Sequence, residues 1–276
     1  MYVGICGHIG MGKTYVANEV GKRLQKLDLN TRRDSFARKV KEFAKDIFFI
    51  TKDGHYLKQK FPYPTYMEDM EKYLLQEEPN KIIFLKQNYP LLQDTTISTF
   101  LEGIITEIPY YHMFQLVQYW SDYYESGFDL EYRLKMARKM LQLIGKFGRE
   151  INKDYWVKFV KENDDSNTIV LIDDLRFLNE AEHMDFIIAL VPTSIGAYFE
   201  LMEKRKVKVN IDTLKDVSEK EWGLIAQELL SEKKEGMFIW VEDDDSLNKD
   251  VLDMITGSII LKYDELHEDG EIVIDR

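Results

Sequence analysis

The chain has 276 residues, 45% of them hydrophobic, which is enough apolar material for one large domain or for a domain with an added lobe. A formal net charge of −12 argues against broad electrostatic binding to DNA or RNA, and no apolar run approaches the ~20 residues needed to span a bilayer. The single cysteine, Cys6, excludes an intramolecular disulfide and suits a cytoplasmic protein. It is expected to be a small buried residue, and the alternative is a catalytic thiol.

A phosphate-binding motif follows the first apolar run. Residues 7–14 read Gly-His-Ile-Gly-Met-Gly-Lys-Thr and fit the pattern G-x-x-x-x-G-K-S/T. Residues 2–6 are typical of a buried strand, and residues 14–27 carry apolar side chains at helical spacing. A strand, a glycine loop and a helix in this order wrap backbone N–H groups around a polyphosphate, above the positive end of the helix. The alternative is a glycine-rich turn before an incidental lysine and threonine.

The motif predicts a role for each of its functional residues. Its glycines turn the backbone toward the phosphates, Lys13 reaches the β- and γ-phosphates, and the Thr14 hydroxyl binds Mg²⁺. The predicted ATP-binding residues are Gly7, Gly10, Gly12, Lys13 and Thr14. His8 stands at a variable position of the pattern and is not expected to take part in the chemistry.

A second strand is expected at residues 31–36, followed by a helix at residues 37–48. Arg38 and Lys41 are three residues apart on that helix, so their side chains are neighbours. Ligands of open α/β sheets bind beyond the carboxyl ends of the strands, so both residues are candidates for substrate binding.

The stretch at about 51–130 differs in composition from the rest of the chain. Five of the six prolines fall here, together with many tyrosines. We interpret it as an inserted lobe with helices at residues 66–76, 97–105 and 111–123, separated by proline turns. Its aromatic residues either stack on a base, form an interface or simply pack against one another.

A strong amphipathic helix is predicted at residues 131–151, and a second helix is expected to run from a cap at residues 152–154 to residue 163. Arg149 lies near the end of the first helix. Trp156 lies on the second helix and faces either a base or the core.

Residues 168–172 form an apolar, β-branched run that ends in Asp173 and Asp174. Such a strand is expected beside the phosphate loop, with its terminal carboxylate reaching Mg²⁺ directly or through water. Adjacent strand residues point to opposite faces, so only one aspartate is expected at the metal, and Asp173 is favoured because it directly ends the run. The other would hold an arginine or cap the next helix. The alternative for either is a plain loop residue.

The last third of the chain continues the alternation of strands and helices. Strands are predicted at residues 185–191 and 237–241, and helices at residues 195–206 and 246–256, with another beginning at 217. A basic cluster at 204–208 includes Arg205. It belongs either to a lid that closes over a bound phosphate or to a solvated helix end.

Four segments resemble the deoxynucleoside monophosphate kinases of tailed bacteriophages. They are the loop at 7–14, the Ser-Phe-Ala segment at 35–37 with Lys41, the segment at 141–157 that contains Gly145, Gly148 and Arg149, and Asp-Leu-Arg-Phe-x-Asn-Glu-Ala at 174–181. A weaker fifth is Ser218-Glu219. The resemblance covers roughly residues 1–50 and 130–260. The chain departs from the family at the insertion, and at Asp216-Val217, where the family usually has His-Pro.

The resemblance implies an α/β P-loop NTPase fold of the nucleoside monophosphate kinase type, with a parallel five-stranded sheet flanked by helices. It implies one kinase domain over residues 1–276, with an inserted helical lobe at about 51–130 and a lid at about 195–218. It also implies transfer of a phosphoryl group from ATP, with Mg²⁺, to a deoxynucleoside monophosphate.

Site roles follow from the motifs and the resemblance together. The catalytic candidates are Lys13, Arg176 and Arg205. The substrate-binding candidates are Arg38, Lys41, Arg149, Trp156, Arg176 and Glu180. The metal candidates are Thr14, Asp173 and Asp174. The alternative for each arginine is a structural ion pair.

Two other functions stay open from the sequence. One is a kinase of another small phosphorylated acceptor, and the other is an ATP-driven switch or assembly protein. The expected partner is a small-molecule substrate, with no nucleic acid and no membrane. The oligomeric state is open, with a homodimer among the options. A phage-encoded chain would work in the host cytoplasm.

Overall fold

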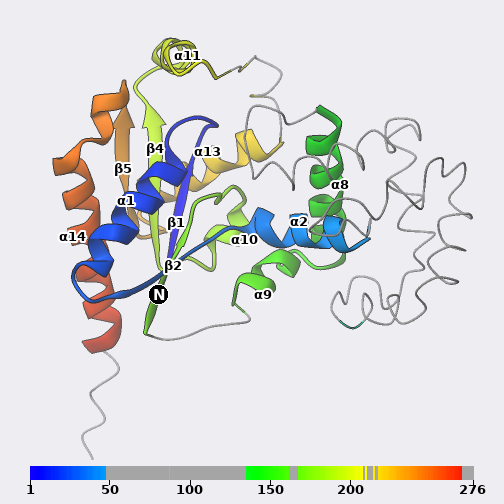
Figure 1. Cartoon of the computed structure of the whole chain (residues 1–276), viewed down its shortest axis with the longest axis horizontal. Helices are drawn as coiled ribbons and strands as arrows, with labels where there is room; N and C mark the ends of the chain where they lie inside the picture. Colours follow the sequence, from blue (N-terminus) through cyan, green and yellow to red (C-terminus); the bar gives the residue numbers. More distant parts are fainter. Residues whose placement is uncertain are drawn as a thin grey trace, which may run out of the picture. The chain divides into compact units, whose positions relative to one another are not determined.

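The computed structural model describes residues 1–47, 87, 135–161, 167–207, 209, 214 and 217–268. The predicted lobe at about 51–130 and its three helices lie outside these residues, apart from Gln87. The chain divides into two compact units, Met1–Phe36 with Val157–Arg276, and Ala37–Trp156. Figure 1 shows the course of the chain through both.

The first unit is built on a parallel sheet. Its strands are β1 (Tyr2–Gly7), β2 (Asn30–Asp34), β3 (Thr168–Ile172), β4 (Phe186–Pro192) and β5 (Gly236–Val241). They lie in the order β2-β3-β1-β4-β5, and every neighbouring pair is parallel. This confirms the predicted α/β class with a five-stranded parallel sheet, and the strand order is a P-loop-like topology.

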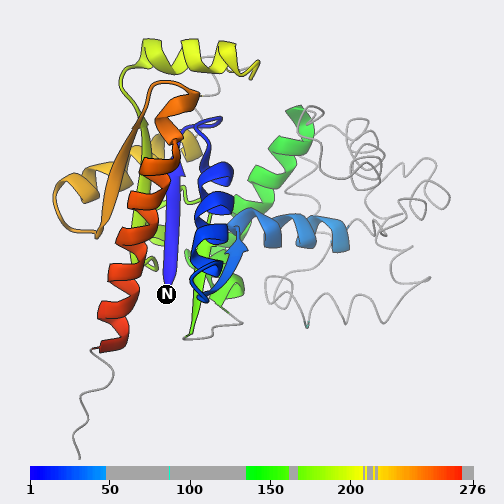
Figure 2. The same ribbon diagram turned by 60° about the vertical axis from the view of Figure 1, so that its left-hand side comes forward.

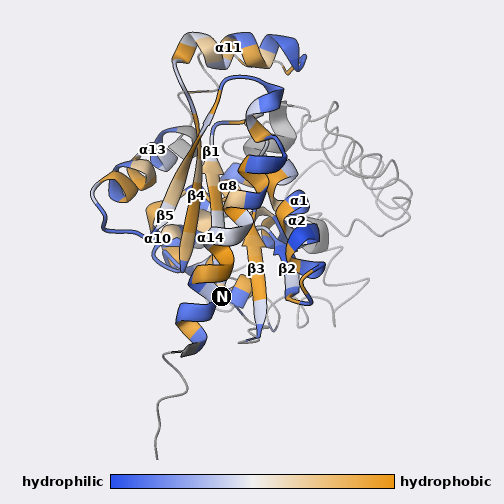
Figure 3. Ribbon diagram, turned by 90° about the vertical axis from the view of Figure 1, so that its left-hand side faces the viewer, coloured by the Kyte–Doolittle hydropathy of each residue, from blue (hydrophilic) through white to orange (hydrophobic). Residues whose placement is uncertain are grey.

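The central strand β1 is buried along its whole length. Val3 and Ile5 belong to one apolar cluster, and Tyr2 and Cys6 belong to the other, as the alternation of a strand requires. A sheet covered on both faces needs apolar residues at successive positions, which explains the continuous runs in β1, β3 and β4. Figure 3 shows this hydrophobic colouring along β3.

Helices cover both faces of the sheet. One apolar cluster takes residues from α1 (Lys13–Gln25), α11 (Ile195–Lys204) and α14 (Lys249–Glu268). The other takes residues from α10 (Leu178–Ala181) and α13 (Val217–Leu230). Figures 1 and 2 both show α1 and α14 side by side. The layered arrangement places the loops that follow the strands at one edge of the sheet, where a ligand can approach.

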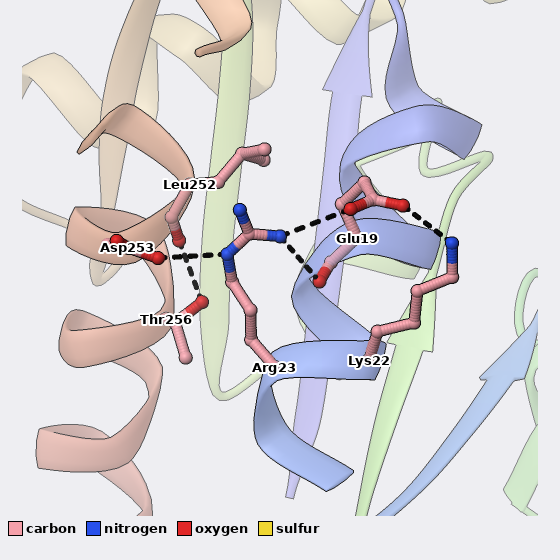
Figure 4. A network of polar contacts seen from close by, with 6 residues as sticks. All are labelled: Glu19, Lys22, Arg23, Leu252, Asp253 and Thr256. Atoms are coloured by element: carbon pink, nitrogen blue, oxygen red, sulfur yellow. Dashed lines mark hydrogen bonds and ion pairs between the residues drawn. The ribbon is translucent and has the colours of Figure 1, made fainter. Parts of the chain in front are cut away.

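Helices α1 and α14 are also joined by a polar network, drawn in Figure 4. Arg23 Nε donates to Asp253 Oδ1 at 2.9 Å, and Arg23 Nη1 donates to Glu19 Oε2 at 3.2 Å. Lys22 Nζ donates to Glu19 Oε1 at 2.7 Å. These groups are partly exposed, so each pair adds little to stability, and the packing between the two helices comes mainly from their apolar residues.

The helix predicted at residues 246–256 has different bounds in the structure. A short 3-10 helix, η3, spans Asp244–Leu247, and α14 then runs without a break to Glu268. Ile255 and Ile259 are fully buried at helical spacing on either side of Gly257, so the buried stripe continues past the glycine. The apolar run at 259–261 therefore belongs to the same helix.

The second unit contains most of α2 (Phe36–Ile47), α8 (Lys135–Ile151) and the start of α9 (Tyr155–Lys161). Trp156 is 2% exposed, and its indole N–H donates to the Gly145 carbonyl at 2.9 Å. A Cβ on Gly148 would lie 2.7 Å from the same indole ring. Gly148 is thus explained by the close approach of Trp156 to α8.

In the described part of the chain, none of the helices is both long enough and apolar enough to cross a membrane.

Candidate functional site

Four chain segments meet at the carboxyl edge of the sheet in the first unit. Because all strands are parallel, the loop at 8–12 after β1, the turn at 173–174 after β3, α11 after β4 and η3 after β5 leave the sheet at the same edge. This is the edge where open α/β sheets bind ligands.

The glycines of the loop have conformations that other residues rarely adopt. Gly7, Gly10 and Gly12 have φ angles of 136°, 80° and 97°. A Cβ on Gly7 would clash with the Leu190 carbonyl oxygen of β4, and one on Gly10 would clash with the Met202 side chain of α11. The backbone therefore needs glycine for its turn and for the close approach of its neighbours.

The loop leads directly into the start of α1. Gly12 is the N-cap residue, no side chain caps the helix, and its first turn contains no acidic residue. The first N–H groups of a helix have no partner within the helix, and they carry its partial positive charge. An anion is the natural partner for this end of α1.

Lys13 is tied to the loop itself. Its Nζ donates to the carbonyls of Gly7 and His8, both at 2.8 Å. The sequence led us to expect that Lys13 would touch only the nucleotide and that its loss would leave stability unchanged. The first part is wrong, because the ammonium group bonds to two loop carbonyls. These bonds predict that loss of Lys13 lowers stability.

Thr14 lies beside the first aspartate after β3. Its hydroxyl donates to Asp173 Oδ2 at 2.8 Å, and Arg33 Nε lies 3.9 Å from the same oxygen. Hydroxyl and carboxylate oxygens are ligands that Mg²⁺ prefers. Among the described residues there is no group of three or more His, Cys, Asp or Glu side chains that could hold a metal. Thr14 and Asp173 bring two oxygen donors together at this edge. Protein sites for Mg²⁺ supply one or two such donors, and waters and phosphate oxygens complete the shell of the ion.

Asp174 has a different partner. Its Oδ1 accepts the backbone N–H of Phe36, the first residue of α2, at 2.9 Å. The helix it caps is α2 and not the helix that follows it in the chain. Strand β3 ends at Ile172, so both aspartates lie in a turn, and our argument from strand alternation does not apply to them. The turn itself gives the two carboxylates separate tasks.

Glu180 holds the loop that contains Arg176. Its side chain is 4% exposed, and Oε2 accepts the backbone N–H groups of Arg176 at 2.9 Å and Phe177 at 3.1 Å. The Arg176 side chain is half-buried on this loop. The carboxylate of Glu180 therefore sets the backbone from which Arg176 projects.

The remaining substrate candidates, Arg38, Lys41, Arg149 and Trp156, belong to the second unit. Arg38 pairs with Glu42 one turn along α2, with 3.2 Å between Nη1 and Oε1. The Arg149 guanidinium lies along its own helix, since a Cβ on Gly145 would be 3.4 Å from Arg149 Nη1. Trp156 is buried, so the structure favours the packing role that the sequence left open for it.

Three side chains near the loop were missed by the sequence analysis. Tyr198 of α11 donates its hydroxyl to the Ile9 carbonyl at 3.1 Å. Trp222 of α13 donates its indole N–H to His8 Nδ1 at 3.1 Å, and the His8 ring centroid lies 5.0 Å from that of Tyr198. His8 was set aside as a variable loop residue. His8 connects the loop to α11 and α13. No local sequence pattern predicts contacts between residues so far apart in the chain.

Arg205, the C-cap residue of α11, also contacts the loop. Its Nη1 donates to the Gly10 carbonyl, and its Nε donates to Asp244 Oδ1 at 2.7 Å. The basic cluster at 204–208 is therefore not simply a solvated helix end, because one of its arginines reaches the glycine loop.

Cys6, the single cysteine of the chain, directly precedes the glycine loop, and burial keeps its thiol protonated. Burial raises the pKa of the Cys6 thiol to about 12, against a smaller opposite effect of the Lys13 charge. It is fully buried in β1, as predicted, and a neutral buried thiol is not a nucleophile.

Comparisons with protein-family models, with curated proteins and with solved structures find no match to this chain. The fold, an α/β arrangement around a parallel five-stranded sheet with P-loop-like topology, is compatible with a P-loop NTPase.

Proposed function

We propose that this protein transfers the γ-phosphoryl group of ATP, with Mg²⁺, to a deoxynucleoside monophosphate, giving ADP and a deoxynucleoside diphosphate. The observation that carries the proposal is the hydrogen bond between Thr14 and Asp173 at 2.8 Å, directly beside a glycine loop at the start of a helix. A threonine after the loop lysine and an acid after a neighbouring strand are the two side chains from which such enzymes hold their metal.

The donor end of the reaction uses the loop and α1. The N–H groups at the start of α1 and the turned backbone at Gly10 and Gly12 bind the phosphates of ATP. Lys13 exchanges its loop carbonyls for phosphate oxygens. Mg²⁺, held by Thr14 and Asp173, would neutralise charge on the β- and γ-phosphates.

Transfer needs positioned positive charge and exclusion of water, with little covalent chemistry from the protein. Arg205 supplies one charge at the loop, since it already contacts the Gly10 carbonyl. Arg176 supplies another from the loop that Glu180 organises. The guanidinium group suits both tasks because its planar fork binds phosphate oxygens in pairs.

The acceptor assignment rests on the family resemblance. Arg38, Lys41 and Arg149 are proposed to bind the acceptor monophosphate. Glu180 and Trp156 are proposed to support this function indirectly, since the first binds backbone N–H groups and the second packs on α8.

A coupled assay of ADP release over deoxynucleoside and ribonucleoside monophosphates tests the proposal. Release that depends on a deoxynucleoside monophosphate is the expected result. ADP release at the same rate with and without every acceptor would support an ATP-driven switch instead. Dependence on a different phosphorylated compound would support the hypothesis of a kinase for another small acceptor.

A further inference from the structure

The turn after β5 connects to the phosphate loop through one arginine. Arg205 Nε donates to Asp244 Oδ1 at 2.7 Å, and Arg205 Nη1 donates to the Gly10 carbonyl. The side chain of Arg205 is 18% exposed, whereas that of Asp244 is 71% exposed. The arginine is therefore enclosed between the loop and the turn, and the carboxylate approaches it from the solvent side.

The turn that carries Asp244 is fixed locally. Asp243 Oδ1 accepts the backbone N–H of Ser246 at 2.9 Å, and Ser246 Oγ accepts the N–H groups of Glu242 at 3.0 Å and Asp243 at 3.1 Å. These bonds cap η3 and hold its first residue, Asp244, in place. Asp244 thus belongs to an ordered element and is not a flexible surface acid.

The same turn also packs on the loop. Leu247, the last residue of η3, is 3% exposed, and a Cβ on Gly12 would lie 2.8 Å from its Cδ1 atom. The 3-10 helix therefore touches the loop at Gly12 directly and at Gly10 through Arg205. Movement of Asp244 relative to the loop is limited by both contacts.

The way Asp244 binds Arg205 leaves the outer end of the guanidinium for another anion. An arginine has five N–H donors, and in the described part of the chain this one uses Nε and Nη1. Asp244 takes only Nε, the inner nitrogen, and does so with a single oxygen. Nη1, one of the two terminal nitrogens, lies at the loop, where it donates to the Gly10 carbonyl. Each terminal nitrogen carries two N–H groups, and a guanidinium binds phosphate oxygens in pairs.

We propose that Asp244 is a positioning residue that holds Arg205 against the phosphate loop, so that its terminal nitrogens bind a phosphate of the nucleotide. This inference rests on the proposed function in one respect, that the loop binds ATP. It adds a residue that belongs neither to the glycine motif nor to the other motifs on which the family resemblance was based. A carboxylate that competed with phosphate for Arg205 would have the opposite effect on affinity, so the two roles are distinguishable.

Calorimetric titration of Mg·ATP into the wild type, Asp244→Asn, Asp244→Glu and Asp245→Asn tests the inference. Asp245 lies in the same exposed turn, so Asp245→Asn is a control that removes the same charge next to the contact. We expect Asp244→Asn to weaken ATP binding about tenfold, the order expected for a charged hydrogen bond. Asp244→Glu should recover part of the loss because it keeps a carboxylate, and Asp245→Asn should bind like the wild type.

A double-mutant cycle separates positioning from a general structural effect. In an Arg205→Ala background, Asp244→Asn should cause no further loss of ATP affinity, since the residue acts through Arg205. Melting temperatures of Asp244→Asn and Asp245→Asn should agree. Unchanged or tighter ATP binding by Asp244→Asn overturns the inference, as does an equal loss in the Arg205→Ala background.

The same titrations keep this inference distinct from the proposed reaction. A wild type that binds ATP but transfers nothing to a monophosphate contradicts the reaction, while the variants still decide the role of Asp244. A wild type that binds no nucleotide contradicts both.

Discussion

The Thr14 hydroxyl donates a hydrogen bond to Asp173 Oδ2 at 2.8 Å, although 159 positions separate the two residues in the chain. The contact exists because β1 and β3 are neighbours in the sheet, with Gly4 opposite Ile172. The loop that leaves β1 and the turn that leaves β3 therefore emerge together. This pairing supports the assignment of the metal to Thr14 and Asp173.

The two aspartates after β3 should respond differently to loss of charge. Asp173→Asn should raise the Mg²⁺ concentration needed for half-maximal activity, because it weakens a metal ligand. Asp174→Asn keeps an oxygen that can accept the Phe36 N–H, so its Mg²⁺ requirement should match the wild type. Mg²⁺ titrations of activity compare the two variants. Equal shifts in both would contradict separate roles for the two side chains.

Lys13→Ala should lower stability as well as activity. Its Nζ satisfies the Gly7 and His8 carbonyls, so removal should reduce the free energy of unfolding by about 1–2 kcal/mol. Lys22→Ala is the matched control, since Lys22 lies on the same helix, has a 66% exposed side chain and pairs with Glu19. Urea unfolding without nucleotide measures both. A Lys13 variant as stable as Lys22→Ala would show that the loop does not depend on the ammonium group.

Several parts of this arrangement were accessible from the sequence because they depend on local patterns. The glycine motif, the apolar runs of β1 and β3 and the acid after β3 are each contained in a short stretch, and they predicted the parallel sheet correctly. The same patterns proposed Thr14 and Asp173 as metal candidates, and the structure brings these two side chains into contact. Burial of Cys6 followed in the same way from its position inside an apolar strand.

Other features depend on contacts between distant segments, which no local pattern encodes. The cap that Asp174 provides to α2 follows from the adjacency of β2 and β3, and the sequence suggested a cap on the next helix. The bond from Trp222 to His8 and the bridge from Asp244 through Arg205 join side chains over long separations. The predicted helix ended at residue 256, whereas α14 continues past Gly257 to Glu268. Tertiary burial of Ile255 and Ile259 outweighs the low helix propensity of glycine.

Arg149 should affect the acceptor and leave the donor unchanged. Arg149→Ala should weaken binding of a deoxynucleoside monophosphate or lower turnover, with ATP affinity close to the wild type, because the two phosphates need separate cations. Arg149→Lys should restore only part of the loss, since lysine lacks the fork. Lys146→Ala on the same helix, with a 67% exposed side chain, serves as control. Calorimetry with ATP and with each monophosphate measures the two affinities separately. Loss of ATP binding with intact monophosphate binding would show that Arg149 is wrongly assigned to the acceptor site.

The Cys6 thiol should make stability fall at alkaline pH. Its pKa is raised to about 12 in the folded chain from 9.0 in the unfolded chain, so the unfolded state loses its proton first as the pH rises. The contribution of the neutral Cys6 thiol to the free energy of unfolding is intact below pH 9.0 and decreases between pH 9.0 and about 12. Relative to Cys6→Ala, the wild type should lose about 2 kcal/mol of stability by about pH 10.5. Urea unfolding of both at several pH values measures this difference, and parallel pH profiles would contradict a buried neutral thiol.

Transfer of label from γ-labelled ATP tests the central claim most directly. With Mg²⁺ and a mixture of deoxynucleoside monophosphates, the wild type should move the label into a deoxynucleoside diphosphate, and Lys13→Ala should do so at least about 100-fold more slowly. Lys22→Ala should match the wild type. Label that appears only as inorganic phosphate, or transfer by Lys13→Ala at the wild-type rate, would contradict the assignment of this protein as a P-loop phosphotransferase acting on deoxynucleotides.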